Sequence, residues 1–174
     1  MSAGKWTIQD MTTDTQHTAD HDPLQPHSHD NNPEAPYIDP TIHFFDPAGN
    51  SKTISLADLM ADYDQTVIPA YTYMTDHGVH GPYKLEGVAL LDLIEQQVGK
   101  NADWTEVEVI SADEFGNRLY RDELAPAGES PVLVCHRSND EQLRRIQGLI
   151  RLVVPSETDN ALRQVKWVRE IRLK

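Results

Sequence analysis

The chain has 174 residues and carries 28 acidic against 15 basic side chains, which gives a formal net charge of −13. This surplus of carboxylates argues against a general nucleic-acid binder and against attachment to an anionic membrane surface, because both require clustered lysine and arginine. The single cysteine excludes an intrachain disulfide and a cysteine-based zinc cluster.

Residues 1–36 are rich in Thr, Asp, His, Asn and Pro and contain few large apolar side chains. Burying so few apolar groups cannot offset the entropy lost on ordering, so we expect a disordered extension. The HSHD segment over residues 27–30, together with His21 and Asp22, either binds a divalent metal loosely or is part of a solvated tail. The amino terminus has no apolar core of the signal-peptide type, and no later stretch reaches the roughly 20 apolar residues of a membrane helix, so we expect a cytoplasmic protein.

A folded domain is expected over residues 37–174, beginning with two strands and a turn between residues 41 and 55. Ser55 and Asp58 have the spacing of a helix N-cap and a variant capping box, in which each side chain bonds the backbone of the other residue. They predict a short helix that ends near Tyr63.

The β-branched and aromatic segment over residues 66–74 predicts a strand, and Pro69 places that strand at a sheet edge or at a bulge. Residues 75–83 hold two glycines, a proline, His77 and His80, and they predict a loop. Loops carry function more often than cores do, so this loop is a candidate pocket wall. A zinc site here lacks a third ligand at a matching spacing.

The segment over residues 86–99 predicts an amphipathic helix, because its apolar residues recur at helical spacing before a terminal glycine. Alternation over residues 105–113 predicts a half-buried strand, and a turn at Gly116–Asn117 would continue it into a hairpin. A further buried strand contains Cys135, which is expected to behave as a small hydrophobe. Short strands mixed with two helices favour an α+β domain that contains several β-segments.

The last part of the chain predicts two strands, one over residues 149–154 and one over residues 165–173. Arg151, Arg163 and Lys166 lie around their junction, where cations beside irregular backbone can hold an anion such as a phosphate. The alternative is a carboxy-terminal hairpin whose charged side chains face water. The chain contains no nucleophile elbow, P-loop, dinucleotide-binding fingerprint or zinc-protease motif, so residue patterns alone name no reaction.

Four segments together resemble the oxidoreductase molybdopterin-binding domain of the sulfite oxidase superfamily. They cover residues 81–99, 104–124, 131–143 and 148–173. A G-V-x-L-x-x-L-L helix, a V-x-x-x-S-x-D strand, an R-L-V-V-P strand and a V-K-W strand follow one another in that family, and similar motifs occur here in the same order. The RLVVP and VKW pair is the most specific part of the resemblance.

The resemblance implies a mixed β-sheet domain of the sulfite oxidase type that binds a molybdenum pterin cofactor. Arg151 matches the arginine of R-L-V-V-P and Lys166 the lysine of V-K-W, and both would lie near the pterin phosphate. Arg163 is a weaker candidate for the same phosphate, and His77 and His80 would line the pocket near the metal. Such a domain would have the cofactor as its small-molecule partner and, as an oxidoreductase subunit, an electron-transfer protein as a second partner.

The chain departs from the family pattern at the metal ligand. Family enzymes bind molybdenum through a cysteine thiolate in the loop after the strand that matches IPAYTYM, and here residues 72–75 contain no cysteine. Cys135 lies in a different, apolar segment. Two functions therefore stay open: a molybdopterin-binding oxidoreductase subunit, or a non-catalytic descendant of that fold that binds a small ligand or a protein partner.

Overall fold

The computed structural model describes residues 36, 39–75, 77–124, 130–157 and 163–174. The extension predicted over residues 1–36 lies outside this part of the chain, apart from Pro36. Most of the secondary structure in the described residues is β-strand, and the strands form two sheets of five strands each. The helices are short. This architecture agrees with the predicted α+β domain of mixed sheets.

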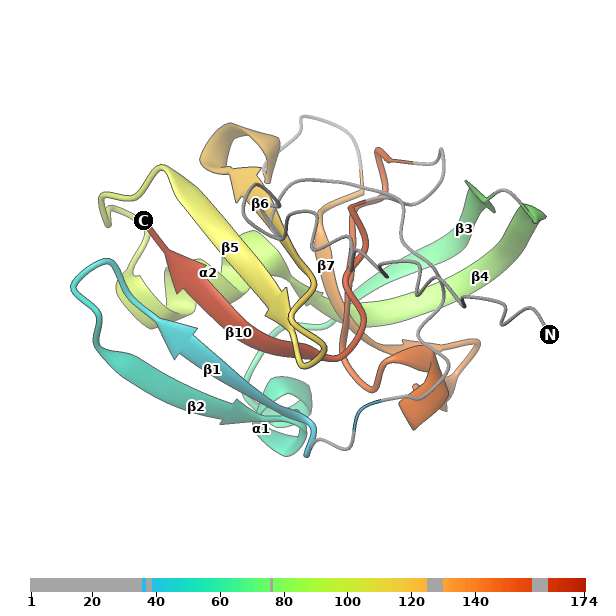
Figure 1. Ribbon diagram of the computed structural model, residues 1–174, viewed down its shortest axis with the longest axis horizontal. Coiled ribbons are helices and arrows are strands. Elements are labelled where there is room, and N and C mark those ends of the chain that lie inside the picture. Colours follow the sequence, from blue (N-terminus) through green and yellow to red (C-terminus); the bar gives the residue numbers. More distant parts are fainter. Residues whose placement is uncertain (1–35, 37–38, 76, 125–129, 158–162) are drawn as a thin grey trace, which may run out of the picture.

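The first sheet consists of β1 (Thr41–Phe45), β2 (Ser51–Ser55), β5 (Glu106–Ser111), β6 (Gly116–Tyr120) and β10 (Val168–Leu173). The strand order is β2-β1-β10-β5-β6, and Figure 1 shows these strands on the side of the molecule that holds the carboxy terminus. The central β1–β10 pair is parallel, and the other neighbours are antiparallel. The carboxy-terminal strand therefore lies in the middle of this sheet.

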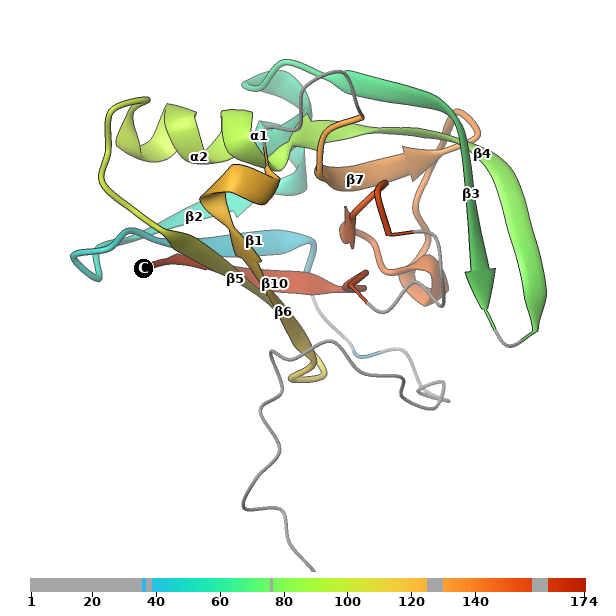
Figure 2. The ribbon, with the colours of Figure 1, turned by 90° about the horizontal axis from the view of Figure 1, so that it is seen from above.

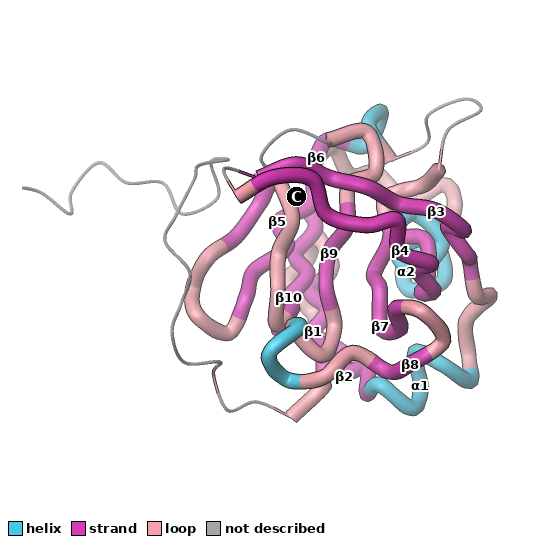
Figure 3. Tube along the Cα trace, turned by 90° about the vertical axis from the view of Figure 1, so that its right-hand side faces the viewer, coloured by secondary structure: helices cyan, strands magenta, loops and turns pink. Residues whose placement is uncertain are grey.

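The second sheet consists of β3 (Thr66–Thr75), β4 (Gly78–Ala89), β7 (Leu133–Ser138), β8 (Glu141–Gln142) and β9 (Arg151–Val153). β3, β4, β7 and β8 follow one another in that order, and β9 also pairs with β7. All of these pairs are antiparallel. Figure 3 looks onto the side of the molecule where these strands gather.

The loop predicted over residues 75–83 is wrong, because residues 78–83 belong to β4 and pair with β3. Met74, for example, lies opposite Val79 near the turn. Glycine and proline suggested a loop, but an irregular two-stranded ribbon with shifts of register tolerates both. β3 is the edge strand and shifts register beside Pro69, which confirms that part of the prediction. Figure 2 shows the hairpin extending away from the rest of the molecule.

The helices are α1 (Leu56–Ala61), α2 (Leu90–Val98) and two single 3-10 turns, η1 (Arg121–Glu123) and η2 (Arg145–Gln147). The predicted capping box is present, because Ser55 Oγ accepts from the Asp58 N–H at 3.1 Å and Asp58 Oδ2 accepts from the Ser55 N–H at 2.9 Å. The helix predicted from residue 86 begins only at Leu90, since residues 86–89 still pair with β7. Within the described residues, no helix is long and apolar enough to cross a membrane.

The prediction that the last two strands pair with each other as a carboxy-terminal hairpin is also wrong. β9 pairs with β7 in the second sheet, whereas β10 pairs with β1 and β5 in the first. The two segments meet at an antiparallel bridge, in which the Leu152 N–H donates to Val165 at 2.8 Å and the Val165 N–H donates to Leu152 at 3.2 Å. This bridge lies where the chain passes from one sheet to the other, and it brings the residues around Arg151 and Lys166 together.

Two apolar clusters form the core. The larger cluster joins both helices to the first sheet, and Leu90, Leu93 and Ile94 of α2 are completely buried in it. The smaller cluster lies between the β3–β4 hairpin and β7, and consists of Ile68, Tyr71, Leu85, Leu133, Cys135, Leu143 and Val153. Several members of the smaller cluster are also exposed to a cavity, so this part of the core supports the candidate site.

Candidate functional site

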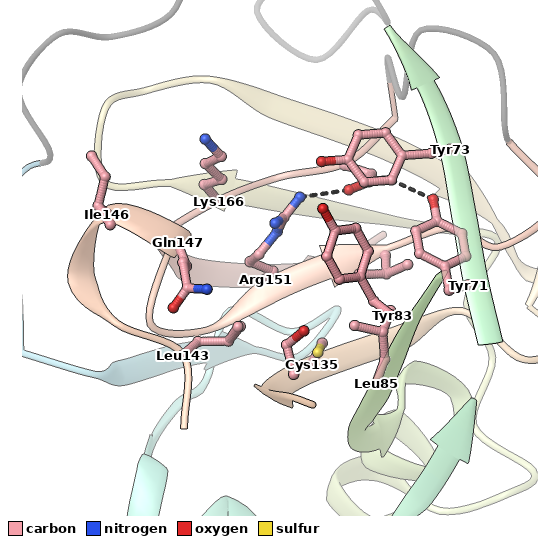
Figure 4. A pocket seen from close by; sticks show the side chains of 13 residues that line it. Tyr71, Tyr73, Tyr83, Leu85, Cys135, Leu143, Ile146, Gln147, Arg151 and Lys166 are labelled. Carbon is pink, nitrogen blue, oxygen red and sulfur yellow. Dashed lines mark hydrogen bonds between the residues drawn. The ribbon is translucent and has the colours of Figure 1, made fainter. Parts of the chain in front are cut away.

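A cavity of about 270 Å³ lies between the β3–β4 hairpin, the strands β7 and β9, the η2 turn and the segment before β10. Figure 4 shows Arg151 near its centre, with tyrosines on one side and Lys166 on the other. Its lining combines aromatic, apolar and cationic groups, as small-molecule sites do. The lining residues are Tyr71, Tyr73, Tyr83, Leu85, Cys135, Ser138, Leu143, Ile146, Gln147, Arg151, Val153, Gln164 and Lys166.

Arg151 and Lys166 line this cavity, and within the described residues neither has a carboxylate at ion-pair distance. Other cations of this acidic chain do have one: Arg137 lies 3.1 Å from Glu86. Burial lowers the pKa of Lys166, the neighbouring charge of Arg151 lowers it further, and the carboxylate of Asp113, beyond ion-pair distance, opposes this shift without cancelling it. The cavity therefore concentrates positive charge in a protein that is strongly negative overall.

Gly148 allows the backbone to close against both cations. Its φ is +110°, and a Cβ on this residue would lie 2.8 Å from Arg151 Cγ and 3.1 Å from Lys166 Cβ. The segment is tied down by Trp167, whose N–H donates to the Gly148 carbonyl at 3.0 Å and whose Nε1–H donates to the Arg145 carbonyl at 2.6 Å. A residue larger than glycine would displace one of the cationic side chains.

The opposite wall of the cavity is aromatic. The ring of Tyr73 stacks on that of Tyr71 with centroids 5.8 Å apart, and lies 6.2 Å from the ring of Tyr83. All three tyrosines come from the β3–β4 hairpin and line the cavity. Burial raises the pKa of Tyr71 to about 12, so its hydroxyl keeps its hydrogen at neutral pH. This wall can pack against a flat ring and still offer polar phenol groups.

The histidines predicted from the sequence lie on the same hairpin but do not line the cavity. His80 stacks on the ring of Tyr73 at 5.0 Å, and one of its ring nitrogens is 2.9 Å from Thr75 Oγ1. His77 is exposed beside the turn, and its backbone N–H donates to Thr75 Oγ1 at 3.2 Å. The predicted pocket wall is thus supplied by tyrosines of the hairpin, with His80 behind one of them.

Arg163 is not in the cavity lining either. Its guanidinium donates to Glu123 at 2.7 Å and to the Arg118 carbonyl at 3.4 Å. Burial raises and Arg163 lowers the pKa of Glu123, and the net shift is downward. This arginine is engaged in an ion pair, whereas Arg151 and Lys166 have no carboxylate at that distance in the part of the chain that the structure describes.

Cys135 is almost completely buried on β7 and also lines the cavity. Its thiol donates to the Arg137 carbonyl at 3.2 Å, and burial raises its pKa to about 11. β3, where the family cysteine was expected, supplies residues Thr72–Thr75 instead. In the part of the chain that the structure describes, no three His, Cys, Asp or Glu side chains are grouped to hold a metal ion.

The three tyrosines and Gln164 were not predicted from the sequence as site residues. Tyr71 and Tyr73 are two residues apart on one strand, and side chains at that spacing lie on the same face of a strand. The sequence therefore contained the information that these two tyrosines lie side by side. Tyr83 joins them only through the pairing of β3 with β4, which the predicted loop obscured. Gln164 had no signal, since its place in the cavity depends on the passage of the chain between the two sheets.

Comparisons with known proteins agree with this architecture. A model of the oxidoreductase molybdopterin binding domain family matches residues 41–174. A comparison with curated proteins gives no match. Among solved structures, the sulfane dehydrogenase SoxCD from Paracoccus pantotrophus is similar with a TM-score of 0.63 and 18% identity, over 80% of this chain and 40% of that chain. That likeness shows the fold alone, whereas the family match covers all of the described strands, so the chain belongs to the oxidoreductase molybdopterin-binding domain family.

Proposed function

We propose that the cavity binds a phosphate-bearing molybdopterin cofactor, with Arg151 and Lys166 at the phosphate and the tyrosine wall against the pterin ring. The observation that carries the proposal is the presence of two cations in one cavity without a carboxylate partner among the described residues. When bound, such a cofactor would supply the redox chemistry of an oxidoreductase. The protein residues would bind it, orient it and exclude water.

The phosphate end of the cofactor fits the cationic side of the cavity. Arg151 Nε is buried and has no hydrogen-bond acceptor among the described residues. A buried donor without an acceptor is costly, and a bound oxyanion would remove that cost through a charge-assisted bond. Lys166 would add a second charge from the neighbouring segment, and Gly148 lets the loop backbone approach both side chains.

The ring end of the cofactor fits the aromatic side. Tyr73 is stacked between Tyr71 and His80, which restricts its orientation before any ligand binds. Leu85, Leu143 and Val153 complete an apolar floor. We infer that His80 supports this wall from behind, whereas His77 and Arg163 lie outside the lining of the cavity.

The cavity offers no cysteine thiolate that could bind the molybdenum of such a cofactor. Cys135 is the only thiol of the chain, and with a pKa of about 11 it is protonated at neutral pH. This observation favours a second function, a non-catalytic binding protein that keeps the pterin pocket. Oxidation of an oxyanion with an artificial electron acceptor, or reduction of a sulfoxide with an artificial electron donor, would contradict this second function and support an oxidoreductase subunit if the activity is lost from protein made without molybdenum.

The binding proposal is tested on protein purified from a molybdenum-replete host. Molybdenum is measured by mass spectrometry, and the pterin by its fluorescence after acid oxidation. We expect pterin in the wild type, a loss of most of it in Arg151→Ala and Lys166→Ala, and no loss in Lys52→Ala, which removes an exposed charge on β2. A wild type with neither pterin nor molybdenum would overturn the proposal.

A further inference from the structure

Gln164 connects the cationic and the aromatic sides of the cavity. Arg151 Nη2 donates to Gln164 Oε1 at 2.6 Å, and Gln164 Nε2 donates to the Tyr71 hydroxyl oxygen. The dashed lines in Figure 4 follow this path from Arg151 to Tyr71. Only 9% of Gln164 is exposed, so water does not compete freely for its amide.

The direction of each bond in this path is fixed by chemistry. A guanidinium can only donate, so the amide oxygen of Gln164 must face Arg151. The amide NH₂ must then face Tyr71, whose oxygen accepts. The hydroxyl hydrogen of Tyr71 is left over, and it finds no acceptor among the described residues. Since Tyr71 lines the cavity, a hydrogen-bond donor is available to whatever the cavity holds.

We propose that Tyr71 is a ligand-binding residue that donates its hydroxyl hydrogen to an oxyanion oxygen of the bound molecule, and that Gln164 is the positioning residue that imposes this direction. The inference rests on the proposed function, because it concerns the same cavity and adds a specificity determinant to it. The path begins at a cation, and hydrogen bonds in a chain polarise one another, so the Tyr71 O–H becomes a stronger donor. Arg151, Lys166 and Tyr71 would all favour an oxygen that carries no hydrogen.

A purely structural role for Gln164 predicts something different. In that case the amide would only link β3 to the segment before β10, and removing the Tyr71 hydroxyl would change stability without changing anion binding. The chain offers a matched control, because Gln97 Nε2 donates to the hydroxyl of Tyr63 at 2.5 Å, and neither residue lines the cavity. Tyr63→Phe therefore removes the same group from the same kind of bond.

The test measures binding of inorganic phosphate to the full chain by calorimetry, at low ionic strength where screening is weakest. One hydrogen bond to a charged group corresponds to an affinity change of about tenfold or more. We expect Tyr71→Phe to weaken phosphate binding by about tenfold, and Tyr63→Phe to leave it unchanged. Equal affinities of Tyr71→Phe and wild type would overturn the inference.

Gln164→Glu tests the positioning role. A carboxylate only accepts, so it would keep the bond from Arg151 but would also take the hydroxyl hydrogen of Tyr71. Tyr71→Phe should then cause no further loss on the Gln164→Glu background, although it costs about tenfold on the wild-type background. The added negative charge weakens phosphate binding equally in Gln164→Glu and in the Gln164→Glu/Tyr71→Phe double variant. Its effect therefore cancels when the two are compared in a double-mutant cycle. The same loss on both backgrounds would overturn the role of Gln164.

Failure of this inference is distinguishable from failure of the proposed function. If Arg151→Ala and Lys166→Ala lose phosphate binding while Tyr71→Phe does not, the anion site stands and Tyr71 is no part of it. If Arg151→Ala and Lys166→Ala both bind phosphate like the wild type, the proposed function itself fails, whatever Tyr71→Phe does.

Discussion

Cys135 and Arg151 are cross-strand partners on β7 and β9, and both line the same cavity. The only thiol of the chain therefore lies beside a cation that has no carboxylate at ion-pair distance among the described residues. Burial raises the pKa of this thiol to about 11, and the charge of Arg151 opposes the rise without cancelling it. Proximity to Arg151 therefore does not make Cys135 a thiolate at neutral pH.

The thiol should accordingly react slowly in the folded protein. A pKa of about 11, against an ordinary value of 9.0, leaves about a hundredfold less thiolate at neutral pH. We expect a disulfide reagent to modify native Cys135 at least about a hundredfold more slowly than Cys135 of the urea-unfolded chain. Spectroscopic rates in the two states measure this ratio, and similar rates would show that the thiol is accessible and ionised.

Gly148→Ala should destabilise the fold and weaken anion binding. The new Cβ would meet Arg151 Cγ at 2.8 Å, in a backbone conformation that favours glycine. We expect a loss of about 1–3 kcal/mol in the free energy of unfolding, measured with urea. Gly49→Ala is the control, since Gly49 also has a positive φ of +85° but no atom within 4 Å of the added Cβ. Equal losses in both variants would mean that the contact with Arg151 has no effect.

His136 should make stability fall in mildly acidic solution. It is buried, its Nε2 lies 2.7 Å from Gln65 Oε1, and its Nδ1 has no partner among the described residues. Burial lowers its pKa below the ordinary value of 6.5, so the unfolded chain binds the proton first as the pH falls. The free energy of unfolding should therefore decrease below a pH of about 6.5.

Urea unfolding at several pH values between about 7.5 and 5 measures this decrease, at pH values where few carboxylates titrate. His136→Asn should flatten the pH dependence even if it lowers stability at every pH. His43→Asn is the control, because His43 is exposed on β1. If the slope in His136→Asn matches that of the wild type, another group causes the pH dependence.

Arg163→Ala should affect stability more than cofactor content. Arg163 pairs with Glu123 at 2.7 Å and lies outside the cavity lining, although it was predicted from the sequence as a phosphate ligand. The pair is partly exposed, so we expect a loss of about 1 kcal/mol or less in the free energy of unfolding. Glu123→Gln should cause a similar loss. A selective loss of pterin in Arg163→Ala, but not in Glu123→Gln, would place Arg163 at the cofactor.

Local patterns predicted local structure well in this chain. The capping box of Ser55 and Asp58 and the edge strand at Pro69 depend on neighbours in the sequence, and both are present. The predicted loop around Gly78 and the predicted pairing of the last two strands with each other were wrong, because both depend on residues far apart in the sequence. Whether β4 continues past its glycines, and whether β9 pairs with β10 or β7, depends on partners far along the chain.

The candidate site shows the same division. Arg151 and Lys166 could be selected from the sequence through the family motifs, yet their common cavity depends on the bridge between Leu152 and Val165. Gln164 carries no motif, and its role emerges only from the direction of its bonds to Arg151 and Tyr71. Side chains that orient other side chains are the hardest to predict, because their function lies in tertiary contacts.

The pterin content of the Arg151→Ala/Lys166→Ala double variant tests whether this cavity is the cofactor site. It is compared with that of the wild type and of Lys52→Ala, all purified in parallel from the same molybdenum-replete host. We predict a fluorescent pterin in the wild type and in Lys52→Ala, and almost none in a double variant that is still folded by circular dichroism. A folded double variant that retains the full pterin content of the wild type would contradict the assignment of this cavity as the cofactor site.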